Sequence, residues 1–237
     1  MSKTWPERVR ELPWSRLLEE LEQEGAAIVP GLLTADECEK IVSLYGQPGL
    51  FRSKVLMARH GYGRGEYQYF DYPLPEPIAE LRSALYAELA PVANRWHEAL
   101  GFEARFPSQH AEFIARCQAA GQTRPTPLIL RYGVGDYNRL HQDLYGEQVF
   151  PLQVAALLSE PGRDFEGGHF VLTEQRARQQ SRPVVLAPRR GDAIVFAVRH
   201  RPVPSKRGSA RVQMRHGVSR LLRGQRHMLG IIFHDAV

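Results

Sequence analysis

Three side chains of the metal-ligating type lie at two places in the sequence. His141 and Asp143 stand two residues apart in L-H-Q-D-L, and His216 follows in R-H-G-V-S-R. Two imidazoles and one carboxylate are the donor set with which proteins hold Fe(II) by one face, leaving its other coordination positions open. Residues two apart on an extended strand project to the same side, so His141 and Asp143 can bind one ion. The sequence therefore predicts a ferrous site made of His141, Asp143 and His216.

An arginine, Arg226, follows His216 by ten positions. Its guanidinium is planar and permanently charged, which suits it to pair with a carboxylate. Iron with open positions and a nearby anchor for a carboxylate fit a dicarboxylic co-substrate, 2-oxoglutarate, together with O₂. We therefore expect an Fe(II)- and 2-oxoglutarate-dependent dioxygenase whose catalytic residues are His141, Asp143, His216 and Arg226.

The alternative is that these residues have nothing to do with one another. His141 would then be a surface histidine, Asp143 a turn residue and His216 a packed strand residue, within a metal-free β-barrel used for binding. Their order, spacing and position among strand-like runs favour the metal site.

Short apolar runs surround the metal-ligating residues. Pro127 to Leu130 leads up to His141, and Gly133 and Gly135 separate the two. Further runs that are β-branched or aromatic, each bounded by Gly, Pro or Asp, are Phe150 to Leu158, His169 to Leu172, Ala193 to Phe196 and Met228 to Phe233. Such spacing is typical of an antiparallel jelly roll, a double-stranded β-helix.

The first half of the chain has helical patterns. Leucines at helical spacing, a capping box at Thr34 and terminal glycines predict four helices, at Trp14 to Glu24, Thr34 to Tyr45, Pro77 to Leu100 and Ser108 to Ala120. Pro91 favours a kink or a division of the third helix. The fold class is therefore α+β, with a double-stranded β-helix core supported by N-terminal helices. We expect one domain over 1–237, in which 1–125 give mainly helical support and a possible substrate lid, and 126–237 form the catalytic jelly roll.

Composition fits a cytoplasmic enzyme. No apolar run is long enough to span a bilayer, and Met1 to Arg10 is too polar for a signal peptide. The two cysteines, Cys38 and Cys117, lie far apart in helical patterns, which predicts reduced thiols. The oligomeric state is not predicted.

Two motifs resemble known enzyme families. Arg131 to Gly135 followed by Leu140 to Asp143 resembles the R-Y-x-x-G-x(4)-L-H-Q-D block of the Fe(II)/2-oxoglutarate nucleic-acid dealkylases. That resemblance implies that Tyr132 contacts 2-oxoglutarate. The H-x(9)-R ending formed by His216 and Arg226 is similar to that of prolyl-hydroxylase-like enzymes.

From about Leu50 to its end, the chain resembles a bacterial 2-oxoglutarate/iron oxygenase family described as acting on damaged DNA. The motifs are F-P-L-Q at Phe150, P-G-x-D-F-x-G-G at Pro161, R-H-G-V-S-R at Arg215 and L-G-I-I-F-H-D at Leu229. The resemblance implies hydroxylation or oxidative demethylation, with an alkylated nucleobase as the first substrate to consider. The prolyl-hydroxylase-like ending favours a different substrate, a protein side chain or a small molecule.

Three positions depart from the patterns of these families. Leu130 and Ile232 stand where the dealkylases carry asparagine and a second arginine, so the other carboxylate of 2-oxoglutarate needs a different partner. His169 stands where the bacterial family is expected to carry an acidic residue. If it faces the interior it adds a nitrogen near the iron, and if it faces outward it is a surface histidine; alternation along a strand favours the second.

Charge and aromatic content bear on a nucleic-acid partner. The formal net charge is +5, and basic residues gather late, at Arg176, Arg178, Arg182, Arg189, Arg190, Arg199, Arg201, Lys206, Arg207 and Arg211. A basic loop from Arg199 to Arg211 is expected to follow phosphates, or else to be an ordinary solvated surface. The segment Met57 to Tyr72 mixes aromatics with bases and glycines. It predicts either a lid that stacks on a base or an ordinary hairpin with Tyr67 and Tyr69 on one face.

Overall fold

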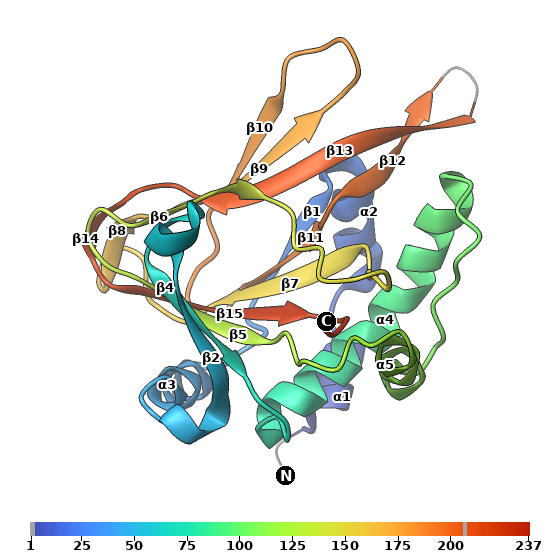
Figure 1. The fold of residues 1–237 in the computed structure, drawn as a ribbon. Coiled ribbons are helices and arrows are strands. Elements are labelled where there is room, and N and C mark those ends of the chain that lie inside the picture. Colours follow the sequence, from blue (N-terminus) through green and yellow to red (C-terminus); the bar gives the residue numbers. More distant parts are fainter. Residues whose placement is uncertain (1–2, 206–207) are drawn as a thin grey trace.

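The computed structural model describes residues 3–205 and 208–237, and two main antiparallel sheets form its centre (Figure 1). The larger sheet has seven strands in the order β1-β11-β7-β15-β5-β4-β2. Their bounds are β1 (Ala26–Val29), β11 (Ala193–Ala197), β7 (Leu152–Leu157), β15 (Arg226–Ile232), β5 (Leu128–Tyr132), β4 (Glu66–Phe70) and β2 (Phe51–Leu56).

The smaller sheet has the order β10-β9-β13-β6-β3, and β12 pairs with β13 beside this path. Its strands are β10 (Arg182–Leu186), β9 (Phe170–Gln175), β13 (Gly208–Val218), β6 (Tyr137–His141), β3 (Gly63–Arg64) and β12 (His200–Ser205). A separate pair joins β14 (Leu221–Gly224) to β8 (Phe165–Gly167). From β5 onward the chain alternates between the two main sheets, because β5, β7, β11 and β15 belong to the larger one and β6, β9 and β13 to the smaller one. This winding is the predicted double-stranded β-helix.

The central strands of the larger sheet are buried along their whole length. Every residue of β7, β11 and β15 is buried, as the continuous apolar runs in the sequence require for strands covered on both faces. Helices α1 (Trp5–Arg10), α4 (Glu76–Ala99) and α5 (His110–Ala119) lie on the side of the larger sheet away from the smaller sheet (Figure 1). The helices therefore do not enter the space between the two sheets, which is lined by side chains of the strands.

Local signals place the helix ends well. Helix α2 (Trp14–Glu24) ends at Gly25, whose φ of 76° is left-handed and suits glycine. Helix α3 (Ala35–Leu44) begins with a capping box between Thr34 and Glu37, as predicted. Helix α4 runs through Pro91 as one helix, so of the two alternatives predicted there the division does not occur. Among the described residues, no helix combines the length and apolarity needed to cross a membrane.

The first half of the chain supplies more than helical support. It contributes β1, β2 and β4 to the larger sheet and β3 to the smaller one. The segment 57–72 lies within a hairpin of β2 and β4, joined by the 3₁₀ helix η2 (Met57–His60) and by β3. Strand β3 pairs with β6 through Gly63 and Arg64, so this part of the chain is hydrogen-bonded to the strand that carries His141. The hairpin alternative is confirmed.

The basic segment Arg199 to Arg211 is not a loop. From His200 on, its described residues form β12 and the beginning of β13, which pair from His200↔Gln213 to Ser205↔Gly208 and project beyond the barrel (Figure 1). Lys206 and Arg207 lie outside the described residues. The prediction of an irregular loop was wrong because Arg201 and Val203 point inward from β12 and are buried, a strand alternation hidden by the charge of the arginine.

Candidate metal centre and its cavity

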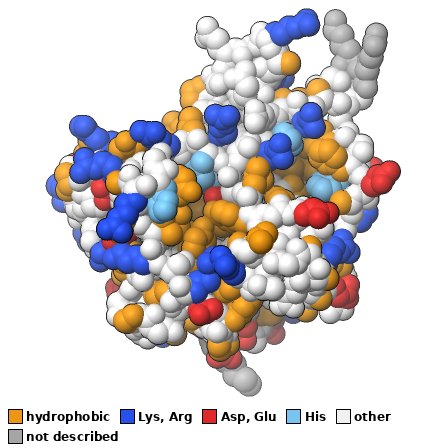
Figure 2. Space-filling model, viewed as in Figure 1, with side chains coloured by type: hydrophobic (Ala, Val, Ile, Leu, Met, Phe, Trp, Pro, Cys, Tyr) orange, Lys and Arg blue, Asp and Glu red, His pale blue; other side chains and the backbone are white. Residues whose placement is uncertain are grey.

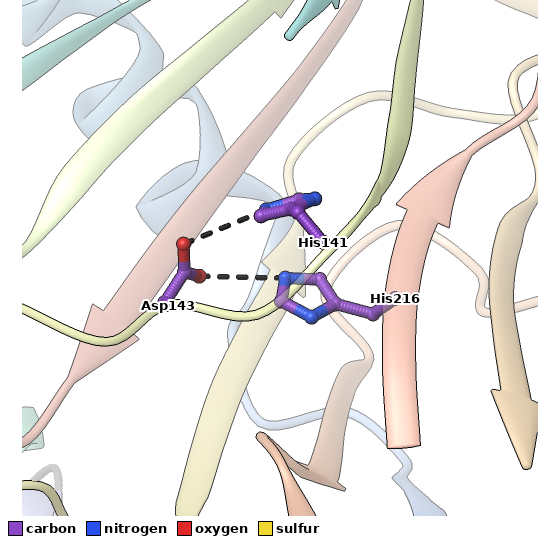
Figure 3. A group of neighbouring side chains, drawn as sticks. All are labelled: His141, Asp143 and His216. Atoms are coloured by element: carbon purple, nitrogen blue, oxygen red, sulfur yellow. Dashed lines mark ion pairs between the residues drawn. The ribbon is translucent and has the colours of Figure 1, made fainter. Parts of the chain in front are cut away.

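Strand pairing brings the two candidate histidines together. His216 of β13 is the direct partner of His141 of β6, and their ring centroids are 4.2 Å apart. Asp143, just beyond the end of β6, lies to one side of the two imidazoles with its carboxylate facing both (Figure 3). Its Oδ1 is 3.5 Å from Nε2 of His141, and its Oδ2 is 3.4 Å from Nε2 of His216. One donor atom from each side chain lies within 4.8 Å of the others, so the three predicted ligands meet at one point.

The charges of this cluster favour cation binding. Burial opposes ionisation of Asp143, but hydrogen bonds from His141 and His216 outweigh it and hold the pKa of the carboxyl well below its usual value. Burial lowers the pKa of His216. His141 uses Nδ1 to donate to the carbonyl of Arg139 at 2.7 Å, and this hydrogen bond orients the ring so that Nε2 faces the carboxylate of Asp143. The neutral form of each imidazole can therefore act as a metal ligand from Nε2.

Asp143 has a partner that the sequence analysis did not identify. The hydroxyl of Tyr145 donates to Asp143 Oδ1 at 2.7 Å, and the hydroxyl of Tyr69 donates to that of Tyr145 at 2.9 Å. The spacing of His141, Asp143 and Tyr145 at every second residue is a signal that could have placed Tyr145 on the same side. No local signal connects Tyr69 to them, because β4 lies far away in the sequence.

The cluster lies in the wall of a cavity of about 540 Å³. Aromatic side chains dominate one part of this wall, contributed by Tyr62, Tyr67, Tyr69, Tyr132 and Tyr145. Tyr67 and Tyr69 meet edge to face with centroids 5.3 Å apart, on one face of β4 as the hairpin alternative predicts. Among the described residues that line the cavity, Arg139 is the one permanent cation and Asp143 the one carboxylate. Basic side chains are also spread over the surface drawn in Figure 2, around a central apolar area.

Arg226 is buried without a counter-ion among the described residues. It begins β15 opposite Tyr132 of β5, and its Cζ is 5.6 Å from the centroid of the Tyr132 ring. Nη2 donates to Sδ of Met228 at 3.2 Å, whereas Nε, Nη1 and the Tyr132 hydroxyl have no hydrogen-bond partner in the part of the chain that the structure describes. Burial lowers the pKa of Arg226 to about 10, so the guanidinium stays charged at neutral pH. An unpaired buried cation is costly, and a bound anion would relieve the cost.

Arg226 does not line the cavity of the three ligands. It lines a neighbouring cavity of about 310 Å³, and Phe170 borders both. Tyr132 and Met228, the two side chains nearest to the guanidinium in the contacts above, line the larger cavity. The guanidinium thus lies behind these two side chains as seen from the metal-ligating cluster.

His169 faces solvent. It is exposed, its backbone N–H donates to the Ser219 hydroxyl at 2.9 Å, and it lines the smaller cavity. The outward alternative is therefore confirmed.

Leu130 lies in the wall of the larger cavity with Asn138 and Gln153, and Oε1 of Gln153 is buried without a partner among the described residues.

Comparison with known proteins gives a family. The sequence model of a family described as "Oxygenase, catalysing oxidative methylation of damaged DNA" matches residues 65–236. Two proteins of Mycobacterium tuberculosis, from strains CDC 1551 / Oshkosh and H37Rv and both named as uncharacterized, are each 49% identical over 167 residues. The aligned part covers 70% of this chain and 72% of each relative.

Solved structures with the same fold are oxygenases at low sequence identity. A prolyl-4-hydroxylase of Pseudomonas putida has a TM-score of 0.51 and 16% identity, over 92% of this chain and 96% of that one. An oxidoreductase of the 2OG-Fe(II) oxygenase family from Burkholderia pseudomallei has a TM-score of 0.54 and 18% identity, over 96% and 94%. These similarities show a shared fold.

Proposed function

The chain belongs to this oxygenase family, and we propose that it is an Fe(II)- and 2-oxoglutarate-dependent dioxygenase that hydroxylates or oxidatively demethylates its substrate. The observation that supports this most directly is the meeting of His141, Asp143 and His216 inside the barrel. We also propose that 1–237 form one domain, because one connected core of buried side chains joins the helices to both sheets.

The residues present fit Fe(II). The donor set has two imidazole nitrogens and one ionised carboxylate, which is the set that holds non-haem iron while leaving positions open. Fe(II) bound there would supply the activation of O₂ coupled to decarboxylation of 2-oxoglutarate to succinate and CO₂. The protein's part is to hold Asp143 charged, to keep Nε2 of both histidines directed at the ion, and to exclude water with the tyrosines of the cavity wall.

Arg226 is proposed to bind the carboxylate of 2-oxoglutarate farthest from the keto group. Within the described residues, two of its nitrogens and the hydroxyl of Tyr132 have no hydrogen-bond partner, so the nitrogens support this role and the hydroxyl offers a further donor. Because Met228 accepts the remaining hydrogen bond and lines the larger cavity, its flexible side chain has to move for the carboxylate to reach the guanidinium from that cavity. Three amide side chains line the same wall, and we assign Asn138 and Gln153 to the carboxylate beside the keto group, because Nε2 of the third, Gln142, donates to the carbonyl of Met214 at 2.7 Å.

The first proposed substrate is an alkylated nucleobase in a nucleic-acid strand. The description of the family supports it, as do the aromatic wall of the cavity and the basic surface around it. A base taken out of its stack can lie against aromatic rings, and arginines near the opening can bind the flanking phosphates. Tyr62, half exposed at the cavity and paired with the His60 ring at 5.3 Å, offers such a surface.

A second candidate substrate is a protein side chain or a small molecule. The spacing between His216 and Arg226 supports it, because this ending is similar to that of prolyl-hydroxylase-like enzymes. Oxidation of either substrate class would use the same three ligands and the same arginine.

One experiment separates these possibilities. Fe(II)-loaded protein is supplied with 2-oxoglutarate, ascorbate and O₂, and succinate is measured with methylated single-stranded oligonucleotides, with unmodified ones and with proline-containing peptides. Formaldehyde release that depends on the methylated oligonucleotide supports the nucleobase proposal. Stimulation by peptides alone supports the second substrate class. Absence of succinate under all conditions, in protein that retains its fold, would contradict the proposed activity.

A further inference from the structure

We propose that Tyr145 is a positioning residue that fixes the orientation of the Asp143 carboxylate for the metal, and that Tyr69 orients Tyr145. This inference rests on the proposed function, because it concerns the same three ligands. It assigns a role to two cavity-lining tyrosines that the metal-ligand set by itself does not include.

The three candidate ligands are held in different ways. His141 and His216 lie on paired strands, so the β-ladder sets where each imidazole begins. Asp143 lies beyond the last residue of β6, in an irregular segment that continues to the beginning of β7. Its side chain therefore depends on contacts other than a strand ladder for a fixed orientation.

Tyr145 supplies such a contact. Its hydroxyl donates to Asp143 Oδ1 at 2.7 Å, a length typical of a strong bond to a charged acceptor. The backbone of Tyr145 is also fixed, because its carbonyl accepts a hydrogen bond from the N–H of Val237 at 3.1 Å. A backbone hydrogen bond at Tyr145 thus connects the segment that carries Asp143 to Val237.

Tyr69 determines which way the hydroxyl proton of Tyr145 points. A phenol has one proton, and the hydroxyl of Tyr69 donates its proton to the oxygen of Tyr145 at 2.9 Å. The proton of Tyr145 is then available to Asp143. Tyr69 is itself held between Tyr145, whose ring lies edge-on at 6.2 Å, and Arg52, whose Cζ is 4.5 Å from the Tyr69 centroid. Arg52 is anchored in turn, because its Nε donates to the carbonyl of Pro125 at 2.9 Å.

The consequence for Asp143 is that its two oxygens differ. Each oxygen faces one imidazole, Oδ1 at 3.5 Å from Nε2 of His141 and Oδ2 at 3.4 Å from Nε2 of His216, but among the described residues only Oδ1 also accepts a tyrosine hydroxyl, that of Tyr145. This assigns Oδ2 as the oxygen free to bind the ion. Without Tyr145 the carboxylate could rotate, and loss of an outer partner of a metal ligand typically weakens metal binding by about 10–100-fold.

The test measures binding of Mn(II), with Mn(II) alone as the probe, to the full-length protein without 2-oxoglutarate or substrate. Tyr145→Phe removes one oxygen and keeps the ring, and we expect its Kd for Mn(II) to rise by about 10–100-fold. Tyr69→Phe keeps the hydrogen bond from Tyr145 to Asp143 but removes the donor that directs the Tyr145 proton toward Asp143. A smaller rise in the Kd for Mn(II) is therefore expected. The matched control is Tyr137→Phe, on the strand of His141 but outside the cavity wall, which should bind as the wild type does.

The electron paramagnetic resonance spectrum of bound Mn(II) provides a second readout. It should change in Tyr145→Phe, because the carboxylate geometry around the ion changes, and should not change in Tyr137→Phe. If Tyr145→Phe fails to fold, Tyr69→Phe carries the test by the same two measurements. Wild-type affinity and spectrum in the tyrosine variants would overturn the inference while leaving the proposed function intact. A wild-type protein that binds neither Mn(II) nor Fe(II) would overturn the proposed function itself.

Discussion

His216 lies directly across the β-ladder from His141, and the carboxylate of Asp143 faces Nε2 of both rings, one oxygen toward each (Figure 3). The two histidines come from strands far apart in the sequence, and only the antiparallel pairing of β13 with β6 brings them together. Because both imidazoles begin on a hydrogen-bonded scaffold, the pairing of the two strands sets where each ring begins. This preorganisation lowers the cost of binding, since few side chains need to be ordered by the metal.

Removal of the carboxylate should abolish metal binding and turnover. In Asp143→Ala the two imidazoles lose the anion that faces both of them, so we expect Fe(II) affinity to fall by more than about 100-fold, beyond the loss typical for an outer partner. Succinate formation from 2-oxoglutarate should fall to background. The matched control is Glu147→Gln, an exposed acid in the same irregular segment. Substantial iron-dependent turnover by Asp143→Ala would exclude the proposed centre.

Replacement of Arg226 should weaken co-substrate binding without unfolding the protein. Arg226→Gln removes a buried charge that has no counter-ion among the described residues, so thermal stability without 2-oxoglutarate should stay the same or rise. The free energy of 2-oxoglutarate binding, measured by calorimetry with Mn(II) present, should become less favourable by about 2–5 kcal/mol, as expected for a lost buried charge pair. Arg223→Gln, on β14 and exposed beside Glu166, is the control for a lost arginine. Unchanged affinity in Arg226→Gln would show that the co-substrate is anchored elsewhere.

Substitution of Arg139 should affect nucleic-acid binding if nucleic acid is the substrate. Arg139 is the permanent cation in the described cavity wall, so Arg139→Ala should weaken binding to single-stranded DNA alike across sequences. The slope of log K against log salt should fall by about 1, as for the loss of one phosphate contact. Arg16→Ala, on the exposed side of α2, should leave the slope unchanged. Equal slopes for Arg139→Ala and the wild type would count against phosphate binding at this cavity.

Acid should destabilise the fold through two buried histidines. Burial lowers the pKa of His110 and of His234 to about 3 in each case, from 6.5. Both stay neutral in the folded chain while the unfolded chain takes up protons below pH 6.5, so stability is full above that pH and is lost as pH falls toward 3. Denaturant titrations should show a loss of about 1–2 kcal/mol per histidine between pH 7 and pH 5.

The variant His110→Gln checks the source of this loss. It keeps a donor for the carbonyl of Phe233, which His110 contacts at 2.8 Å, and it cannot titrate in this range. The slope of unfolding free energy against pH should therefore become shallower by up to about 1.4 kcal/mol per pH unit. His60→Gln, at an exposed histidine, is the control that should keep the wild-type slope. A wild-type slope in His110→Gln would assign the acid sensitivity to other groups.

Local sequence was sufficient wherever the structure depends on neighbouring residues. The capping box at Thr34 and the glycine at position 25 place the ends of α3 and α2, because those contacts lie within a few residues. A similar capping box at Thr4 begins α1, which the sequence analysis did not predict although Thr4 and Glu7 carried the signal. The apolar runs of β7, β11 and β15 were likewise recognisable, since strands buried on both faces need continuous apolar sequence.

Local sequence was insufficient wherever a distant partner changes how a residue is buried. Arg201 is buried in β12 because Glu174 of β9 neutralises it, and this pairing concealed the strand within a basic, proline-rich segment. Nothing in the sequence around Arg201 or around Glu174 indicates that these two side chains meet. A buried ion pair between strands is decided by the packing of the sheet.

By itself the sequence determined the chemistry: two imidazoles, a carboxylate two residues from the first, and an arginine ten residues after the second. Side-chain type and the two-residue period of a strand are local properties, so they can be read without the fold. Tertiary structure decided that His216 faces His141, that Tyr69 supports Tyr145, and that Arg226 lies in a neighbouring cavity behind Tyr132 and Met228. These relationships depend on which strands pair and on which side chains fill the barrel, and both follow from burial of the whole chain.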